Sequence, residues 1–215
     1  ILSTRNFCIC SRDTEVNKVI LISSDKAVRP KNIMGASKQL SEFIIKQFAL
    51  EDKKTIYALV RFGNVLDSSG SVVPLFKKQI ASGGPITLTH PEVVRYFMTI
   101  PEAADLVLHT SLMAKSGDTF ILDMGCPIKI KELATKMILA SGLSVKNAEN
   151  PNGDIEIINT GLRPGEKLYE ELLVDGKALS TIHPRIFKSS EKSISYDKIW
   201  EDIDILEESL KKYDL

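Results

Sequence analysis

Three consecutive polar residues, Ser24, Asp25 and Lys26, follow an apolar and largely β-branched run that ends at Ser23. Ligands of open α/β sheets bind at the carboxyl ends of strands, so side chains in this position are well placed for catalysis. An acid and an amine side by side can donate and accept protons if their surroundings move their pKa values apart. The alternative is structural, with Ser24 and Asp25 forming a turn or a helix cap and Lys26 solvated.

The sequence RPGEK, from Arg163 to Lys167, lies at the start of a predicted helix. A positive side chain beside a helix N-terminus suits a diphosphate, and a carboxylate can accept hydrogen bonds from both hydroxyls of a ribose. We therefore predict that Arg163 and Glu166 hold a nucleotide. The alternative is that Pro164 and Glu166 only stabilise the first turn of the helix, which leaves Arg163 unexplained.

A stretch rich in glycine and proline interrupts the alternation of strands and helices, which favours an inserted substrate-binding lobe. Within it we predict that Val72, Pro74 and Leu75 pack against a uracil ring, and we include Thr87 among the substrate contacts. Arg95 is the residue type that binds phosphate oxygens in a bidentate manner. The alternative for Arg95 is a surface ion pair with Glu92.

Apolar runs alternate with amphipathic helical patterns, and this order predicts an α/β fold with a parallel sheet. The expected strands are 16–23, 56–62, 119–124 and 154–159, with shorter strand-like segments at ITLT and RYFMT. The expected helices are 34–50, 72–82, 101–115, 130–141, 165–173 and 197–212. Residues 1–15 show neither helical nor strand periodicity over a useful length.

Acidic and basic residues balance at 28 each, so the overall charge favours neither nucleic acid nor an anionic membrane surface as a partner. The cysteines are odd in number and form no metal-ligand pattern, which favours a reducing cytoplasm over a disulfide-bonded secreted protein. No apolar run approaches the roughly 18 residues of a membrane-spanning helix, and no signal peptide is visible. We therefore expect a soluble, cytoplasmic protein without a metal site that acts on a small molecule.

The segment SSDKAVRPKNIMGASK resembles the active-site segment of the nucleotide-sugar 4,6-dehydratases of polysaccharide biosynthesis, which belong to the extended short-chain dehydrogenase/reductase superfamily. The resemblance continues through LVRFGNVLDSSGSVVPLFKKQIASGGPITLTHPEVVRYFMTIPEAADLVL and GLRPGEKLYEELL, and it covers roughly residues 16–173. Several independent motifs in the same order make the match specific.

The resemblance implies roles for the polar residues. Lys38 corresponds to the lysine of the superfamily's Tyr-x-x-x-Lys pair, which holds the nicotinamide ribose. Met34 occupies the tyrosine position, as in the large membrane-anchored members, and its thioether cannot accept the proton of the sugar 4-hydroxyl. Lys26 would be the base that removes the C5 proton, Asp25 the acid that protonates the C6 oxygen, and Ser24 a hydrogen-bonding partner of the sugar O4.

Further contacts follow from the same resemblance. Ser23 and Arg61 are assigned to the cofactor site together with Lys38. Asn64 would hydrogen-bond the sugar or the diphosphate, with Gly63 permitting close approach of the backbone. For Arg61 to Asn64 an ordinary turn at a strand end is an equally simple alternative.

The implied fold is the C-terminal part of a Rossmann-like doubly wound parallel sheet with an interleaved smaller α/β substrate-binding lobe. We assign residues 1–66 and 101–124 to the NAD(P)-binding part and residues 67–100 and 125–215 to the lobe. The glycine-rich turn that binds a cofactor pyrophosphate is not found in this sequence. We therefore expect a piece of a longer protein that is a weak catalyst alone.

The implied function is 4,6-dehydration of UDP-N-acetylglucosamine with bound NAD or NADP, which serves capsule, O-antigen or other glycan synthesis in bacteria. We also expect a homo-oligomer and a parent protein that can be anchored to the inner membrane with this part facing the cytoplasm. A UDP-hexose 4-epimerase or reductase is the enzymatic alternative, and a non-catalytic nucleotide-sugar-binding fragment is the other. A purely structural protein would have no reason to carry all these motifs together.

Overall fold

The computed structural model describes residues 1–68, 70–172, 178–190 and 198–213. Its helical elements are α1 (Leu2–Asp13), the 3-10 helix η1 (Asp25–Ala27), α2 (Ile33–Glu51), α3 (Val72–Ala81), α4 (Ile100–Met113), α5 (Ile130–Ala140) and α6 (Ile199–Tyr213). Its strands are β1 (Lys18–Ser24), β2 (Ile56–Phe62), β3 (Asn64–Val65), β4 (Ile86–Leu88), β5 (Val94–Arg95), β6 (Phe97–Met98), β7 (Thr119–Leu122), β8 (Ile128–Lys129), β9 (Val145–Lys146), β10 (Ile155–Asn159), β11 (Ala178–Ser180) and β12 (Ile186–Ser189).

The chain divides into two compact units. The first consists of Ile1–Phe62, Leu106–Asp123 and Glu171–Leu215, and the second of Gly63–Asp105 and Met124–Glu170. Our prediction placed all of residues 125–215 in the substrate lobe, whereas in the structure Glu171–Leu215 belong to the first unit. The structural reason is that β12 pairs with β7 and extends the first unit's sheet.

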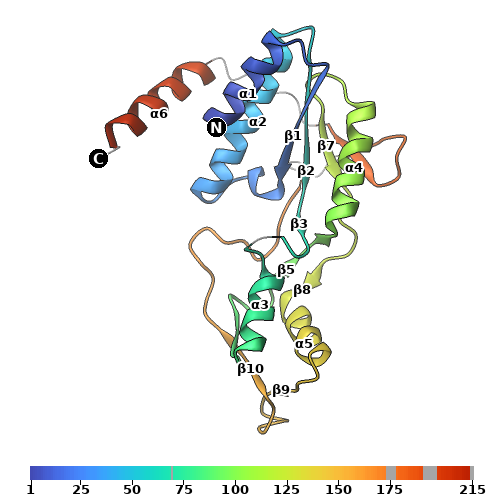
Figure 1. The fold of residues 1–215 in the computed structure, drawn as a ribbon, viewed down its shortest axis with the longest axis vertical. Coiled ribbons are helices and arrows are strands. Elements are labelled where there is room, and N and C mark those ends of the chain that lie inside the picture. The colour runs from blue at the N-terminus through green and yellow to red at the C-terminus, as the bar shows by residue number, and fades with distance from the viewer. Residues whose placement is uncertain (69, 173–177, 191–197, 214–215) are drawn as a thin grey trace. The chain divides into compact units, whose positions relative to one another are not determined.

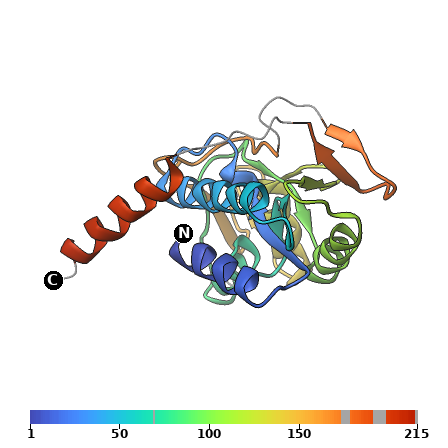
Figure 2. The ribbon, with the colours of Figure 1, turned by 90° about the horizontal axis from the view of Figure 1, so that it is seen from above.

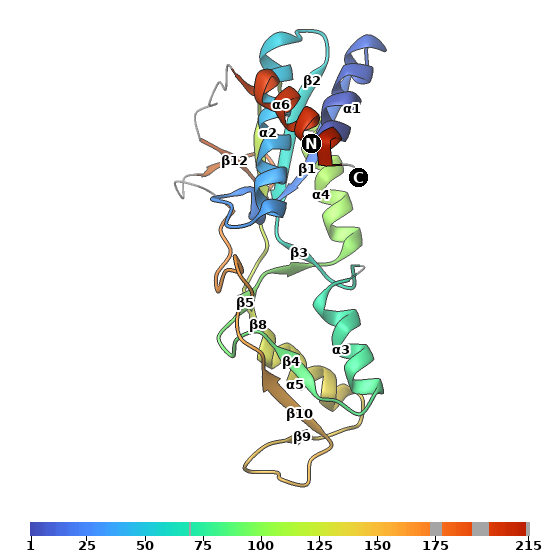
Figure 3. The same cartoon turned by 90° about the vertical axis from the view of Figure 1, so that its left-hand side faces the viewer.

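The first unit is built on a five-stranded sheet in the order β1-β2-β7-β12-β11. β1, β2 and β7 are parallel, and β12 and β11 continue the sheet in antiparallel fashion. Strands β2 and β7 are almost continuously apolar and buried, as expected for parallel strands covered on both faces. Helices α1 and α2 lie together on one side of β1 and β2, and the α4 turns that belong to this unit lie on the other side (Figures 1 and 3). The predicted parallel α/β architecture is confirmed.

Helix α1 corrects the expectation that residues 1–15 form no regular element. Its N-cap residue, Ile1, makes no side-chain cap hydrogen bond, and its first turn has no acidic residue. Cys8 is fully buried in a core cluster with Phe48 and Tyr57. Tertiary packing therefore selects this helix where its own sequence gives little preference.

Helix α6 is held to the first unit by apolar and ionic contacts. Ile199 and Ile203 are buried in the same core cluster, and Arg5 of α1 forms ion pairs with Asp204 at 2.8 Å and with Glu207 at 2.7 Å. The far end of α6 projects away from α1 and α2 (Figure 2).

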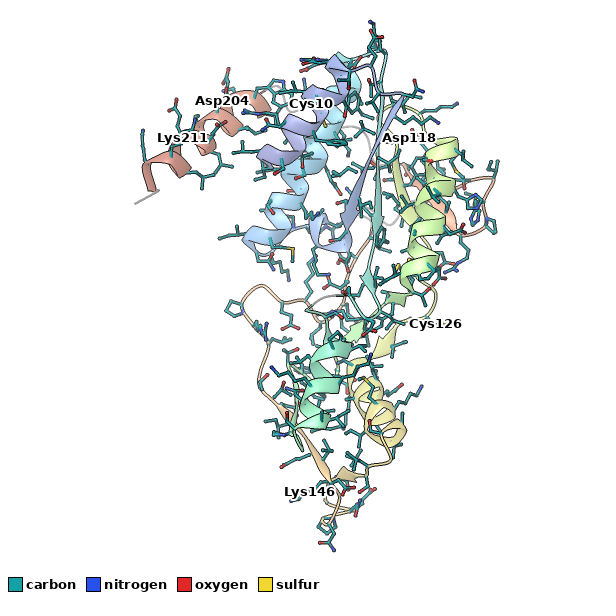
Figure 4. All side chains as sticks on the ribbon, in the orientation of Figure 1. Cys10, Asp118, Cys126, Lys146, Asp204 and Lys211 are labelled. Atoms are coloured by element: carbon teal, nitrogen blue, oxygen red, sulfur yellow. The ribbon has the colours of Figure 1, made fainter. Side chains whose placement is uncertain are left out.

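The cysteines of α1 should differ strongly in reactivity. Burial raises the pKa of the Cys8 thiol to about 12, from a usual value of 9.0, whereas Cys10 is exposed on the same helix (Figure 4). Because only the thiolate reacts, the raised pKa of Cys8 lowers its reactive fraction at pH 8 by about 10³-fold. We expect iodoacetamide to label Cys10 and Cys126 while Cys8 stays unmodified, as tandem mass spectrometry would show. Equal labelling of Cys8 and Cys10 in the folded chain would contradict the packing of α1.

The second unit has its own core and its own sheet, in the order β4-β10-β9 with parallel pairing. Helices α3 and α5 contact each other and β4 (Figure 3). Phe76, Ile86, Ile138 and Ile155 are buried together between these elements. The strand-like segment RYFMT forms two short strands instead of one, since β5 pairs with β8 and β6 with β3.

The helix predicted over residues 165–173 is wrong for the described residues up to Leu172, which form turns and bends. The carbonyl oxygens of Lys167 and Leu168 accept hydrogen bonds from the guanidinium of Arg95, which tie this segment to β5. Leu168 also accepts a hydrogen bond from the backbone of Val94. Across the described residues, none of the helices is long and apolar enough to traverse a lipid bilayer.

Candidate active site

The acidic and basic residues at the end of β1 form a close pair. The Nζ of Lys26 lies 2.9 Å from Oδ1 of Asp25. The Asp25 side chain is 2% exposed and that of Lys26 is 31% exposed, so the amine borders solvent while the carboxylate lies behind it. A group that enters from solvent at this strand end would meet the amine first.

Ser24 has the structural role that was the alternative prediction. It is the N-cap of η1, and its hydroxyl accepts a hydrogen bond from the backbone N–H of Lys26 at 3.1 Å. The cap fixes the turn that places Asp25 and Lys26 directly after the strand. Capping leaves the hydroxyl proton of Ser24 available as a hydrogen-bond donor.

Helix α2 carries the other two predicted catalytic residues. Its N-cap Asn32 accepts a hydrogen bond from the backbone N–H of Gly35 at 2.9 Å. Met34 and Lys38 are both exposed, and they share one face of the helix because they are four residues apart. The chain therefore presents a thioether and an ammonium group on the same side of α2.

Ser23 and Arg61, assigned to the cofactor site, are buried and bound to Glu42. The Ser23 hydroxyl donates to Oε1 of Glu42 at 2.6 Å. The Arg61 guanidinium donates to both carboxylate oxygens of Glu42, at 2.9 and 2.8 Å. Their contact with a cofactor stays a prediction. Glu42 was missed by sequence reasoning, although its spacing of four from Lys38 on a helix was a usable signal.

The substrate-binding candidates of the second unit have different surroundings. Asn64 donates from its side-chain amide to the carbonyl oxygen of Tyr96 at 3.3 Å. The Thr87 hydroxyl accepts a hydrogen bond from the amide of Gln79 at 2.8 Å. Val72 and Pro74, in the first turn of α3, are partly exposed. These four side chains were predicted to touch substrate, and this role stays a prediction.

Arg95 is enclosed by the segment that follows Arg163. Its guanidinium donates to the carbonyl oxygens of Lys167 at 2.7 Å and Leu168 at 3.1 Å. It also forms ion pairs with Glu166 at 3.5 Å and Glu170 at 3.6 Å, and its side chain is only 11% exposed. Arg95 thus ties residues 166–170 to β5.

The alternative ion pair of Arg95 with Glu92 is not formed. Glu92 lies 2.9 Å from Nζ of Lys129, and the hydrogen bond and charge of this lysine lower the pKa of Glu92. The two residues are close in sequence, but β5 pairs with β8 and brings Lys129 beside Glu92 instead.

Glu166 is held in place from two directions. One carboxylate oxygen accepts a hydrogen bond from the Thr89 hydroxyl at 2.9 Å, and the other accepts from the backbone N–H of Arg163 at 3.2 Å. Arg163 itself is exposed. Arg163 and Glu166 were both predicted to hold a nucleotide. In the structure Arg163 is exposed to solvent, and the carboxylate of Glu166 supports the loop that carries Arg163.

A cavity of about 270 Å³ lies elsewhere in the first unit, beside the amino end of β7. It is lined by Lys46, Ala49, Leu50, Ser116, Gly117, Asp118, Thr119, Lys188 and Ser189. None of the predicted site residues is among them. The predicted chemistry belongs to the opposite, carboxyl ends of the parallel strands, as in other open α/β sheets.

Comparison with known protein families gives a match over most of the chain. The family model described as "Polysaccharide biosynthesis protein" matches residues 1–191. The capsular polysaccharide biosynthesis protein CapD of Staphylococcus aureus is 52% identical over 185 residues, which cover 86% of this chain and 29% of CapD. A UDP-glucose 4-epimerase of Rickettsia rickettsii is 37% identical over 80% of this chain and 48% of its own length. The chain thus spans less than half of these two relatives.

Solved structures show the same fold. Pen from Bacillus thuringiensis has a TM-score of 0.77 and 35% identity, covering 87% of this chain and 57% of Pen. DesIV from Streptomyces venezuelae, a dTDP-glucose 4,6-dehydratase with NAD bound, has a TM-score of 0.67 and 16% identity, covering 79% of this chain and 55% of DesIV. The predicted Rossmann-like fold is confirmed by these likenesses.

Proposed function

Because the chain belongs to the polysaccharide biosynthesis protein family, we propose that it forms the catalytic strand ends and the substrate lobe of a nucleotide-sugar 4,6-dehydratase. The proposed substrate is UDP-N-acetylglucosamine and the proposed product is its 4-keto-6-deoxy derivative. A relative named for capsular polysaccharide biosynthesis supports a product used for capsule or related glycans.

The observation that carries the proposal is the pair of Asp25 and Lys26, 2.9 Å apart at the end of β1. Loss of water from a 4-keto sugar requires a base for the C5 proton and an acid for the C6 oxygen. A shift of one proton within the pair gives a neutral amine and a carboxylic acid. The Lys26 amine can then take the C5 proton while Asp25 protonates the C6 hydroxyl, which departs as water. The pair returns to its ionised form in the same step.

A nicotinamide cofactor would accept a hydride from C4 and return it to C6 in this reaction. The donor set on α2 fits such a group, since the exposed ammonium of Lys38 can donate to a ribose hydroxyl and add positive charge nearby. NAD bound by the structurally similar DesIV is in accord with this assignment. We place Ser23 and Arg61 behind this contact, because both are buried against Glu42.

Ser24 is proposed to orient the 4-hydroxyl of the sugar. Its hydroxyl oxygen accepts from the backbone of Lys26 and keeps a second lone pair. As the hydride leaves C4, this oxygen can take the proton of O4 while its own proton passes to water. The methionine at position 34 cannot fill the role of base. Of the candidate catalytic residues in this chain, we therefore assign the proton transfers to Ser24, Asp25 and Lys26.

The test is to incubate the complete protein with UDP-N-acetylglucosamine and NAD⁺ in deuterated buffer and to follow the sugar by NMR. A new C6 methyl signal, a C4 ketone or its hydrate, and deuterium at C5 are the expected results. Absence of all three, with substrate bound, would sink the proposal.

The UDP-glucose 4-epimerase relative makes 4-epimerisation the second candidate. An epimerase would keep the C6 hydroxymethyl group, change the configuration at C4 and incorporate no deuterium at C5. A paired acid and base at residues 25 and 26 has no task in such a reaction, which is why we favour dehydration.

Two arginines of the second unit should separate loop support from nucleotide binding. Arg95→Ala leaves the carbonyl oxygens of Lys167 and Leu168 without their donor, so the free energy of unfolding should fall by about 1–3 kcal/mol. Arg163→Ala removes an exposed side chain, so stability should change by less than about 0.5 kcal/mol, while UDP affinity should fall about tenfold. Denaturant unfolding and calorimetric titration with UDP measure the two effects. Wild-type UDP affinity in Arg163→Ala would contradict its proposed role in nucleotide binding.

A further inference from the structure

Ser23, Glu42 and Arg61 form a buried polar cluster in the first unit. The side chains of Arg61 and Glu42 are 4% and 2% exposed, and Ser23 and Arg61 face each other as partners in the β1–β2 ladder. The three thus join the next-to-last residues of two neighbouring strands to the middle of α2. Guanidinium and carboxylate meet through two parallel hydrogen bonds, a geometry that fixes orientation as well as distance.

Stability alone gives little reason for this cluster. Burying two charges carries a large desolvation cost, and apolar side chains of similar size in their place often leave stability unchanged or improve it. What apolar side chains do not supply is directional bonding. The hydrogen bonds of the cluster are directional, so they fix the rotation of α2 about its own axis, which hydrophobic packing does not.

The residues that this rotation controls are those with proposed chemistry. Glu42 follows Lys38 by four residues and Met34 by eight, so all three share one face of α2 over about 12 Å of helix. Ser23 directly precedes the segment of Ser24, Asp25 and Lys26. Glu42 therefore accepts a hydrogen bond from Ser23, the residue before Ser24, Asp25 and Lys26. It also lies on the same face of α2 as Met34 and Lys38.

A second contact fixes the N-terminal end of α2. A Cβ atom built on Gly35 would lie 2.5 Å from the carbonyl oxygen of Lys26 and 3.0 Å from Cβ of Pro30. Only glycine permits this approach, so the start of the helix rests directly on the backbone of η1. Contacts at Gly35 and Glu42 together determine both the position and the rotation of α2 relative to Lys26.

We propose that Glu42 is a positioning residue, which holds Lys38 at the geometry that a cofactor ribose requires relative to Asp25 and Lys26. This inference rests on the proposed function for its effect on turnover, but the clamp itself can be measured without any sugar substrate. A change at Glu42 should loosen α2 and η1 while the groups they carry stay chemically intact.

The test compares Glu42→Gln with Glu51→Gln in the complete protein. The control makes the same change on the same helix at an exposed position. Glu42→Gln should speed amide hydrogen exchange at residues 25–27 and 33–38, weaken NAD⁺ binding tenfold or more and lower kcat by a similar factor. Glu51→Gln should leave all three at wild-type values.

The double variant Glu42→Met with Arg61→Met separates positioning from folding. It removes both charges, so Tm should stay close to the wild-type value, while NAD⁺ affinity and turnover fall as in Glu42→Gln. A double variant with wild-type NAD⁺ affinity and turnover would overturn the proposal. If the wild-type protein does not dehydrate the sugar, the proposed reaction fails, and NAD⁺ affinity alone decides on Glu42: a tenfold loss supports the clamp and an unchanged value refutes it.

Discussion

Lys26→Ala in the complete protein is expected to lower 4,6-dehydration by about 10³-fold, within the range of general acid–base catalysis. The amine lies at the solvent side of the pair with Asp25, and we assign to it the removal of the C5 proton. Oxidation at C4 does not require this amine, so the variant should still accumulate reduced nicotinamide in a single turnover. NMR in deuterated buffer should show no deuterium at C5.

Asp25→Asn should give a different pattern, because it removes the acid and leaves an amine that must release its proton to solvent, instead of to Asp25, before it can act as the base. Deuterium should enter C5 while the C6 hydroxymethyl group persists, since the departing oxygen is not protonated.

Lys31→Ala changes an exposed lysine between η1 and α2. It is the matched control for Lys26→Ala and should behave as wild type. Rapid deuterium entry at C5 in Lys26→Ala would show that another group is the base.

The main parallel strands were predictable because their apolar runs leave a strong signature in sequence. Strands β2 and β7 are buried along almost their whole length, as parallel strands covered on both faces are, whereas β1 is the edge strand of the sheet and leaves Ile22 51% exposed. The amphipathic pattern and the N-cap Asn32 likewise mark α2. By contrast, α1 depends on Cys8 packing against Phe48 and Tyr57, and such a contact between distant residues is invisible in a local pattern.

The segment from Arg163 to Glu170 shows the opposite kind of failure. Proline, glycine and glutamate in sequence are typical of a helix start, and they predicted one. In the structure, Arg95 donates to the carbonyl oxygens of Lys167 and Leu168, and the Thr89 hydroxyl donates to the carboxylate of Glu166. Hydrogen bonds from the side chains of Arg95 and Thr89 thus outweigh the helical preference of the local sequence, and the segment forms a loop tied to other elements of the second unit.

The candidate site was predictable where function depends on neighbours in sequence. Ser24, Asp25 and Lys26 are adjacent, so their proximity required only the position of one strand end. Glu42 was not identified, because its partners Ser23 and Arg61 come from two different strands. The spacing of four from Lys38 places Glu42 on the same face of α2, but its partners depend on the register of the sheet, which spacing along the chain does not reveal.

The second unit should lose about 3–5 kcal/mol of its free energy of unfolding in Phe76→Ala. Phe76 is 1% exposed in the core cluster with Ile86, Ile138 and Ile155, and truncating a buried aromatic side chain combines lost burial with a cavity. Native-state hydrogen exchange can locate the effect. Amides of α5 and β10 should lose protection, whereas those of β1 and β2 should not, because the first unit has a separate core.

Leu75→Ala is the control for this prediction, as its side chain is the neighbour of Phe76 on α3 and is 43% exposed. Its effect should stay within about 0.5 kcal/mol. If Phe76→Ala reduced protection in β1 and β2 as much as in α5, the chain would unfold as one cooperative body. The separate cores would then describe packing only, and a substitution in the second unit would also weaken the strand end that carries Asp25 and Lys26.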